Sequence, residues 1–406
     1  MKLPRVRFAE LFRVKHGYAF KSRFFDSSGP YALLTPGNFH EEGGFRDQGE
    51  KQKYYTGDVP EGFILSEGDL LIAMTEQAVG LLGSSAWIPE SNRYLHNQRL
   101  GLIVDLDESR LDKRYLYYLF NTAEVRHQIA ASASGTKVRH TAPERIGRVE
   151  VNLAPISSQR KVAKCLTAYD DLIENNLRRI ALLEESARLL YREWFVRLRF
   201  PGHEHTRIID GVPEGWERLF LDELCKIGRG SSPRPIANFM GGTIPWFKIG
   251  DATASESCFV FKTNELVTED GSKRSVPVVP GDLILSNSAT CGIPYFAGVP
   301  GCIHDGWLHF KDYKRFSPIF LYCALYFKKD ELVSSVGDGT TQKNLNTDAV
   351  GRLKLVLPTA SALIDQFEGF AKPCFQLIYN LAQQNQKLRA ARDLLLPRLM
   401  RGEIAV

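Results

Sequence analysis

The sequence predicts an α+β protein made of two tandem homologous α/β domains, each followed by a long helix. Shifting the 406-residue chain by 213 positions aligns GDLLIAM at 68–74 with GDLILSN at 281–287, and segment 8–21 with 221–234. Each copy then ends in an alternating, strand-like stretch, a proline and a long helical stretch. A period of about 210 residues is far too long for a solenoid repeat, so the chain contains two copies of one domain.

The copies stay aligned with small changes of offset, as expected where surface loops differ in length. The later matches are 95–103 with 303–311 at an offset of 208 residues, 115–120 with 320–325 at an offset of 205, and 134–153 with 338–357 at an offset of 204. The repeat divides the chain into a first domain at 1–155, a first long helix at 156–203, a second domain at 204–358 and a second long helix at 359–406.

Composition narrows the class of protein. A hydrophobic fraction of 44% and a charged fraction of 24% are typical of globular proteins, and no apolar run reaches the ~18 residues of a membrane span. The opening MKLPRVRFAE lacks the apolar core of a signal peptide. Seven scattered cysteines, never spaced C-x-x-C, favour reduced thiols and a cytoplasmic location. The net charge of +5 permits a polyanionic partner without requiring one.

The first long helix is predicted by the absence of proline and glycine between Pro155 and Pro201. Ser157 or Ser158 can cap its start. Apolar residues recur at heptad spacing, as in a coiled-coil seam. The predicted seam is Leu166, Ile173, Leu177, Ile180, Ala187 and Trp194. Roughly 40 helical residues would make a rod of about 60 Å.

The second helix carries a similar seam, with an amide in it. The predicted seam is Ile378, Leu381, Asn385, Leu388 and Leu395, and buried Asn385 could fix the register. Gly369 and Pro373 predict a kink or a short separate first segment. Each helix could pack on its own domain alone. Pairing of the two helices is favoured, because one interface then covers both narrow apolar stripes.

No catalytic motif recurs in the two copies. The chain lacks a Walker A sequence, a G-x-S-x-G, an H-E-x-x-H and a G-x-G-x-x-G that opens a helix after a strand. Asp312-Tyr313-Lys314 matches the end of a nuclease motif, but the first copy has nothing similar. His203 and His205 in the linker 200–217 suggest a metal, yet an exposed hinge is favoured because no further ligands lie nearby. We therefore expect no catalytic residue and no metal.

Polar loops recur instead, at equivalent places in both copies. They are 74–80 with 287–292, 15–23 with 228–234, and 135–140 with 339–344. Glycine beside Lys, Arg, Gln and Asn suits close contact with phosphates and base edges. Hydrogen-bonded turns or solvated loops are the alternative. Because the scaffold repeats while the loop side chains differ, the pattern predicts two recognition surfaces for two different short sequences.

These residues resemble the specificity subunit of type I DNA restriction–modification systems. The likeness is carried by IPWFKIGD (244–251), the two GDL strands, GTTQKNLN (339–346), the stretch 151–176 and PEGWE (213–217), and it spans essentially the whole chain. The first copy departs from this pattern, with SGTKVRHT (134–141) in place of GTTQKNLN.

The resemblance implies two target recognition domains, each for one half of a bipartite, asymmetric DNA site. It also implies that the long helices pack as an antiparallel coiled coil with pseudo-twofold symmetry and space the half-sites. Such a subunit is not an enzyme. It recruits two methyltransferase subunits and, through them, restriction subunits, so S-adenosylmethionine, ATP and Mg are expected on those partners. A non-catalytic coiled-coil adaptor with two ligand- or protein-binding domains remains the alternative, and a self-sufficient DNA enzyme would need a motif that is missing.

Candidate DNA contacts follow from the loops. In the first domain they are Lys15, Tyr18, Lys21, Asn38, Glu76, Gln77, Gln98, Arg99, Lys137, Arg139 and His140. In the second they are Arg229, Ser231, Ser232, Arg234, Lys248, Asp251, Asn287, Ser288, Trp307, Gln342, Lys343 and Asn344. Asn38 and Asp251 could instead cap turns. Arg178, Arg188 and Arg192 are candidates for contact with the methyltransferase.

Overall fold

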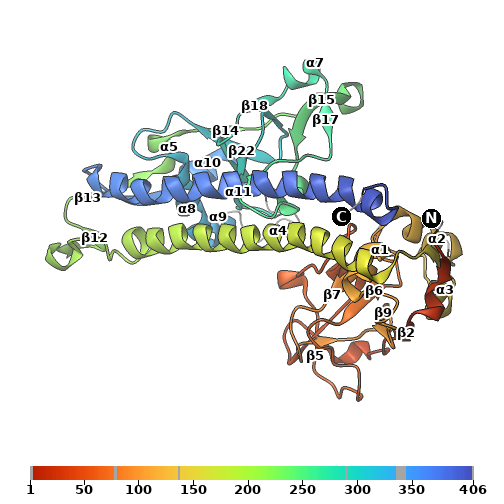
Figure 1. Cartoon of the computed structure of the whole chain (residues 1–406). Coiled ribbons are helices and arrows are strands. Elements are labelled where there is room, and N and C mark those ends of the chain that lie inside the picture. Colours follow the sequence, from red (N-terminus) through yellow and green to blue (C-terminus); the bar gives the residue numbers. More distant parts are fainter. Residues whose placement is uncertain (1–2, 77–79, 136–137, 289, 335–343, 405–406) are drawn as a thin grey trace. The chain divides into compact units, whose positions relative to one another are not determined.

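The computed structural model describes residues 3–76, 80–135, 138–288, 290–334 and 344–404 (Figure 1). The chain forms two compact units, Met1–Asp171 with Arg389–Val406, and Leu172–Leu388. Each unit holds one α/β copy and a part of each long helix. The seven cysteines all lie in the described residues, and none of them forms a disulfide bond. Within the described residues, no helix combines the length and apolar character that a membrane crossing requires.

The first unit contains two four-stranded sheets and a two-stranded one. One sheet has the order β2(Arg13–His16), β9(Leu100–Val104), β6(Leu70–Ala73), β7(Ser85–Trp87), and the other β3(Phe25–Asp26), β5(Tyr54–Tyr55), β4(Tyr31–Leu33), β8(Tyr94–Leu95). β1(Arg5–Arg7) pairs with β10(Glu150–Asn152). The helices are α1(Lys113–Phe120), α2(Ala123–Ser132), α3(Pro143–Gly147), the start of α4(Ile156–Tyr191) and the end of α11(Ala362–Met400).

The second unit repeats this plan. Its larger sheet has the order β14(Lys226–Arg229), β22(Trp307–Lys311), β19(Leu283–Ser286), β20(Pro294–Ala297), β16(Phe259–Val260), and its smaller sheet β17(Leu266–Val267), β15(Met240–Phe247), β21(Gly301–Ile303), β18(Val276–Val278). β13(Trp216–Phe220) pairs with β23(Lys354–Pro358), and β11(Ile208–Ile209) with β12(Val212–Pro213). The helices of this copy are α5(Leu221–Leu224), α6(Ile249–Thr253), α7(Glu269–Ser272), α8(Pro318–Phe327), α9(Lys329–Ser334) and α10(Thr347–Gly351).

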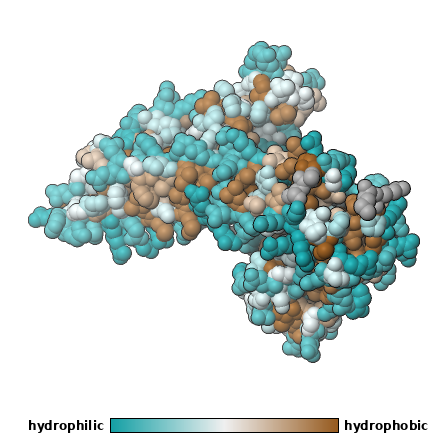
Figure 2. Space-filling view, in the orientation of Figure 1, coloured by the Kyte–Doolittle hydropathy of each residue, from teal (hydrophilic) through white to brown (hydrophobic). Residues whose placement is uncertain are grey.

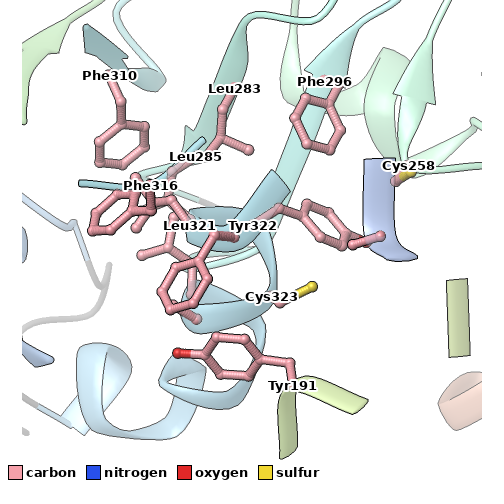
Figure 3. Packing of buried hydrophobic residues seen from close by; sticks show 14 of the residues in the cluster. Tyr191, Cys258, Leu283, Leu285, Phe296, Phe310, Phe316, Leu321, Tyr322 and Cys323 are labelled. Atoms are coloured by element: carbon pink, nitrogen blue, oxygen red, sulfur yellow. The ribbon is translucent and has the colours of Figure 1, made fainter. Parts of the chain in front are cut away.

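The repeated GDL strands are inner strands, β6 in the β2-β9-β6-β7 sheet of the first unit and β19 in the five-stranded sheet of the second. Leu283 and Leu285 of β19 point into a core with α8, shown in Figure 3, whereas Ile284 belongs to a second core on the other face. In the first copy, Leu70 and Leu71 of β6 divide between two cores in the same way. A strand covered on both faces needs a continuous apolar run rather than alternation. This requirement explains why the same stretch occurs twice.

The long helices pack against each other in both units. In the second unit, Ile180 and Ala187 of α4 share a core with Ile378 and Leu381 of α11. In the first, the start of α4 shares a core with the end of α11, where Leu399 is buried. The helices therefore run antiparallel, as Figure 1 shows, and the prediction of pairing is confirmed.

Burial along the predicted seam is graded. Leu166, Ile173, Ile180, Ala187, Ile378, Leu381 and Asn385 are buried, whereas Leu177, Trp194, Leu388 and Leu395 are half-buried. Beside Leu177, Asn176 is buried instead and donates a hydrogen bond from Nδ2 to Asn385 Oδ1 at 2.9 Å. Near the end of the helix a π-helical turn, Arg192–Val196, follows α4. Its extra residue per turn shifts the buried position from Trp194 to Phe195.

Two alternatives were expected around Gly369 and Pro373, a kink or a separate first segment, and the separate segment is wrong. α11 is continuous through Gly369 and Pro373. Both residues are exposed, whereas Phe367, Ala371 and Phe375 on the opposite face are buried in the core. Burial of that face outweighs the single hydrogen bond that proline cannot donate.

Candidate nucleic-acid interface

The predicted contact loops of the second copy meet at one edge of its larger sheet. Register pairs place Arg229 of β14 opposite Leu308, and Ser286 of β19 opposite Trp307. The loops that follow β14 and β19 and precede β22 therefore leave the sheet side by side. Leu345 N donates to Asn287 O at 2.8 Å, which brings the segment around Asn344 to the same edge.

The first copy forms the same edge. His16 of β2 lies opposite Gly101, and Ala73 of β6 lies opposite Leu100. Thr141 N donates to Met74 O at 2.9 Å, the equivalent of the bond between Leu345 and Asn287. Each copy thus brings together the described parts of three loops that the sequence marked separately.

A glycine allows the first loop of each copy to turn back over the edge. A Cβ on Gly17 would lie 2.0 Å from Asn97 O, and a Cβ on Gly230 would lie 2.0 Å from His304 O. No other residue type fits against backbone at that distance. The two positions are equivalent in the repeat, so the glycines belong to the scaffold.

Several candidate residues hold this scaffold from inside. Asn38 and Asp251 are buried caps, and their side chains accept hydrogen bonds from Thr35 N at 3.0 Å and Lys248 N at 2.8 Å. This arrangement agrees with the turn-capping alternative. Trp307 and Asn287 are also fully buried. Trp307 Nε1 donates to Phe247 O at 3.0 Å, and Asn287 Nδ2 donates to Asp305 O at 2.9 Å.

A histidine sits beneath the edge in both copies. His96 Nε2 lies 3.0 Å from Leu100 O, and burial lowers the pKa of His96 to about 4. Burial also lowers the pKa of His304, the equivalent residue in the second copy. Both imidazoles are therefore neutral at neutral pH, and neither adds positive charge for a polyanion.

Three candidates of the second copy, Arg229, Ser232 and Arg234, gather around Asp305, a residue that sequence reasoning missed. Arg229 Nε donates to Asp305 O at 2.8 Å, and the Ser232 hydroxyl donates to the carboxylate. Arg234 lies 3.9 Å from the other carboxylate oxygen. The hydrogen bond from Ser232 lowers the pKa of Asp305. The only sequence signal was its place beside the histidine that is kept in both copies.

A cleft adjoins this cluster and has a volume of about 680 Å³. Its lining residues are Ser232, Pro233, Arg234, Pro235, Ile236, Met240, Trp246, Lys248 and Glu265. Lys248 forms an ion pair with Glu265, and its ammonium lies 4.9 Å from the centre of the Trp246 ring. Ser231 is exposed and donates to Arg274 O at 3.1 Å, while Ser288 is half-buried.

In the first copy, the candidates divide between exposed and internally paired side chains. Lys21, Gln98, Arg99 and His140 are exposed. The half-buried candidates have partners within the domain. Lys15 donates to Gly62 O at 2.6 Å, and Tyr18 packs on Phe20 and Phe63. The Arg139 guanidinium lies 3.8 Å from the Glu76 carboxylate. Gln77, Lys137, Gln342 and Lys343 lie outside the described residues. Over the described part of the chain, no group of His, Cys, Asp and Glu could hold a metal.

Two copies of one domain, each with a polar loop edge and both built on a shared pair of antiparallel helices, define a recognition scaffold. The family model for the type I restriction modification DNA specificity domain matches residues 5–185 and 213–366. The chain belongs to this family. It is a DNA specificity subunit of a type I restriction–modification system, a class of subunit that is not itself an enzyme.

Individual relatives agree with this assignment. The chain is 28% identical to the type I restriction enzyme MjaIX specificity subunit of Methanocaldococcus jannaschii, over 72% of this chain and 69% of that one. It is 24% identical to the type I restriction enzyme HindI specificity subunit of Haemophilus influenzae, over 75% of this chain and 80% of that one. The crystal structure of an S subunit from M. genitalium shares the fold, with a TM-score of 0.60 at 16% identity over 98% and 95% of the two chains.

Proposed function

We propose that the chain binds one bipartite, asymmetric DNA site. The domain at 1–155 recognises one half-site and the domain at 204–358 recognises the other. The observation that carries the proposal is the repeated loop edge, in which Gly17 and Gly230 occupy equivalent places while the exposed side chains differ. A common scaffold with different contact residues suits two different half-sites.

The paired helices would act as the spacer between the half-sites. Two linked binding domains gain effective concentration only when the linker matches the distance between their targets. The gap between half-sites must also respect the DNA repeat of about 34 Å per turn, so that both domains meet the correct groove. Helices that pack along their length are stiffer than a loop and suit this role.

The outer faces of the helices would dock two methyltransferase subunits and, through them, the restriction subunits. Leu182, Leu189 and Val196 recur at seven-residue spacing and are 63%, 38% and 52% exposed. Figure 2 shows hydrophobic residues at the surface along the long helices. Arg178 is exposed beside Glu174, whereas Arg188 and Arg192 are half-buried beside Glu184 and Glu193. S-adenosylmethionine, ATP and Mg would bind to those partners.

Two measurements test the proposal. Purified chain, alone and with its methyltransferase subunit, is titrated with duplex DNA at several salt concentrations, and methylated bases are mapped in a host that carries both. We expect a two-part motif with a fixed gap. Absence of duplex affinity at every salt concentration, with and without the methyltransferase, would instead support the adaptor alternative.

A further inference from the structure

Asp305 lies at the loop edge of the second domain, in the turn between β21 and β22, with 48% of its side chain exposed. Most of the other contact candidates there are basic or neutral. A carboxylate on a surface that meets DNA is repelled by the phosphates. Its presence at the centre of the contact cluster therefore needs a reason.

The backbone of Asp305 holds the turn through two hydrogen bonds, and its carboxylate adds a third with Ser232. Its carbonyl oxygen accepts from Arg229 Nε at 2.8 Å and from Asn287 Nδ2 at 2.9 Å. Any residue type supplies a carbonyl oxygen, so these two bonds do not explain why an acidic residue stands here.

The Ser232 hydroxyl orients the carboxylate, and the carboxylate can still accept further hydrogen bonds. Oδ1 accepts from the Ser232 hydroxyl and lies 4.0 Å from His304 Nδ1. For Oδ2, the described residues provide the Arg234 guanidinium at 3.9 Å, which is beyond a hydrogen bond. Oδ1 is thus held in place by Ser232, while Oδ2 can accept a hydrogen bond from a bound molecule.

We propose that Asp305 is a specificity-determining residue that accepts a hydrogen bond from the exocyclic amino group of one base, cytosine N4 or adenine N6, in the major groove. These are the major-groove groups that donate to a carboxylate, whereas guanine and thymine present acceptors there. The inference rests on the proposed function and names a contact within it. The equivalent turn position of the first domain is Asn97, which is 8% exposed, so the two domains differ at this point.

The test uses Asp305→Ala in the full chain, bound to its methyltransferase subunit. Ala removes both acceptor oxygens and keeps the backbone bonds of the turn, whereas Asn would still accept from cytosine N4 or adenine N6. Binding is measured to a duplex library in which each base pair of both half-sites is varied. We expect preference for C or A at one position of the second half-site to fall by roughly 10- to 100-fold, while the first half-site is recognised as before.

Asp312→Asn is the control for loss of an acidic charge on the same strand, because Asp312 lies at the other end of β22 and pairs with Lys226 at 2.7 Å. It should leave every base preference unchanged. A uniform loss on all sequences for Asp305→Ala, with an unchanged melting temperature, would assign Asp305 to loop positioning and overturn the inference. Unchanged preferences would overturn it as well. If the wild-type complex showed no two-part preference, the proposed function itself would fail, which is a distinguishable outcome.

Discussion

The buried amide pair Asn176–Asn385 is the clearest single determinant of how the helices align. Asn176 donates to Asn385, and Asn385 Nδ2 donates to Ile173 O at 3.2 Å. An amide among apolar seam residues loses its bonds if the helices slide past each other, because no second amide then meets it. Both side chains lie within the second unit.

We predict that Asn385→Leu lowers the free energy of unfolding by about 1–3 kcal/mol, because Asn176 is left without its buried partner. Urea titration measures the change. The double replacement Asn176→Leu with Asn385→Leu removes both polar groups and should recover most of the loss. A double variant as unstable as the single one would contradict this account.

Gly230 tests the scaffold at the loop edge. Gly230→Ala puts a methyl group 2.0 Å from His304 O, so the turn that carries Asp305 must move. We expect lower thermal stability and at least tenfold weaker binding to the second half-site, measured by titration with duplex DNA. Gly250→Ala is the control, since nothing lies within 4 Å of its Cβ and the residue is helical. It should be neutral or slightly stabilising.

His96 makes stability depend on pH. Its folded pKa of about 4 lies below the ordinary value of 6.5, so the unfolded chain binds the proton more readily between those values. This contribution is fully present above pH 6.5 and is lost as the pH falls from 6.5 toward 4. About 2 kcal/mol should disappear between pH 7 and pH 5. Urea titrations at both values measure it, and His96→Gln should show a smaller difference.

The long helix α11 tolerates two unfavourable residues within one continuous element. Glycine has a low helix propensity, and Pro373 removes one intrahelical hydrogen bond, yet Gly369 and Pro373 both lie on the exposed face. Helix continuity here comes from packing of the opposite face rather than from local propensity.

Gly369→Ala and Pro373→Ala are therefore predicted to stabilise the chain, by about 1 kcal/mol and up to ~3 kcal/mol respectively. A Cβ on Gly369 meets nothing within 4 Å, so space does not oppose the change. Thermal unfolding measures both variants. Destabilisation by Pro373→Ala would indicate that the helix needs a bend at this position.

For the molecule as a whole, recognition of two half-sites implies a strict gap. Changing the DNA gap by one base pair alters the separation by about 3.4 Å and the rotation by roughly one tenth of a turn. If the paired helices are stiff, affinity should fall to that of a duplex with one half-site, a loss of roughly 10²–10⁴. Titration with a gap series measures this. Equal affinity over several gap lengths would show that the helices do not set the spacing.

Local sequence patterns were sufficient for the elements and their repetition. The doubled GDL strand, the heptad spacing around Ile173 and Ile180, and the glycine-rich loops all carry information within a few residues of each other. They predicted the duplication, the helix pairing and the family. The polar loop residues were harder to assign, because Asn38, Trp307 and exposed Arg99 are equally plausible contacts until their burial is known.

The sequence alone established a duplicated α+β chain with two long helices and two sets of polar loops. Only the tertiary structure decided that Asn176 faces Asn385, that α11 continues through Pro373, and that Asp305 lies among Arg229, Ser232 and Arg234. The reason is physical. Burial and hydrogen-bond partners depend on segments that lie far apart along the chain, and no local pattern encodes which of them will meet.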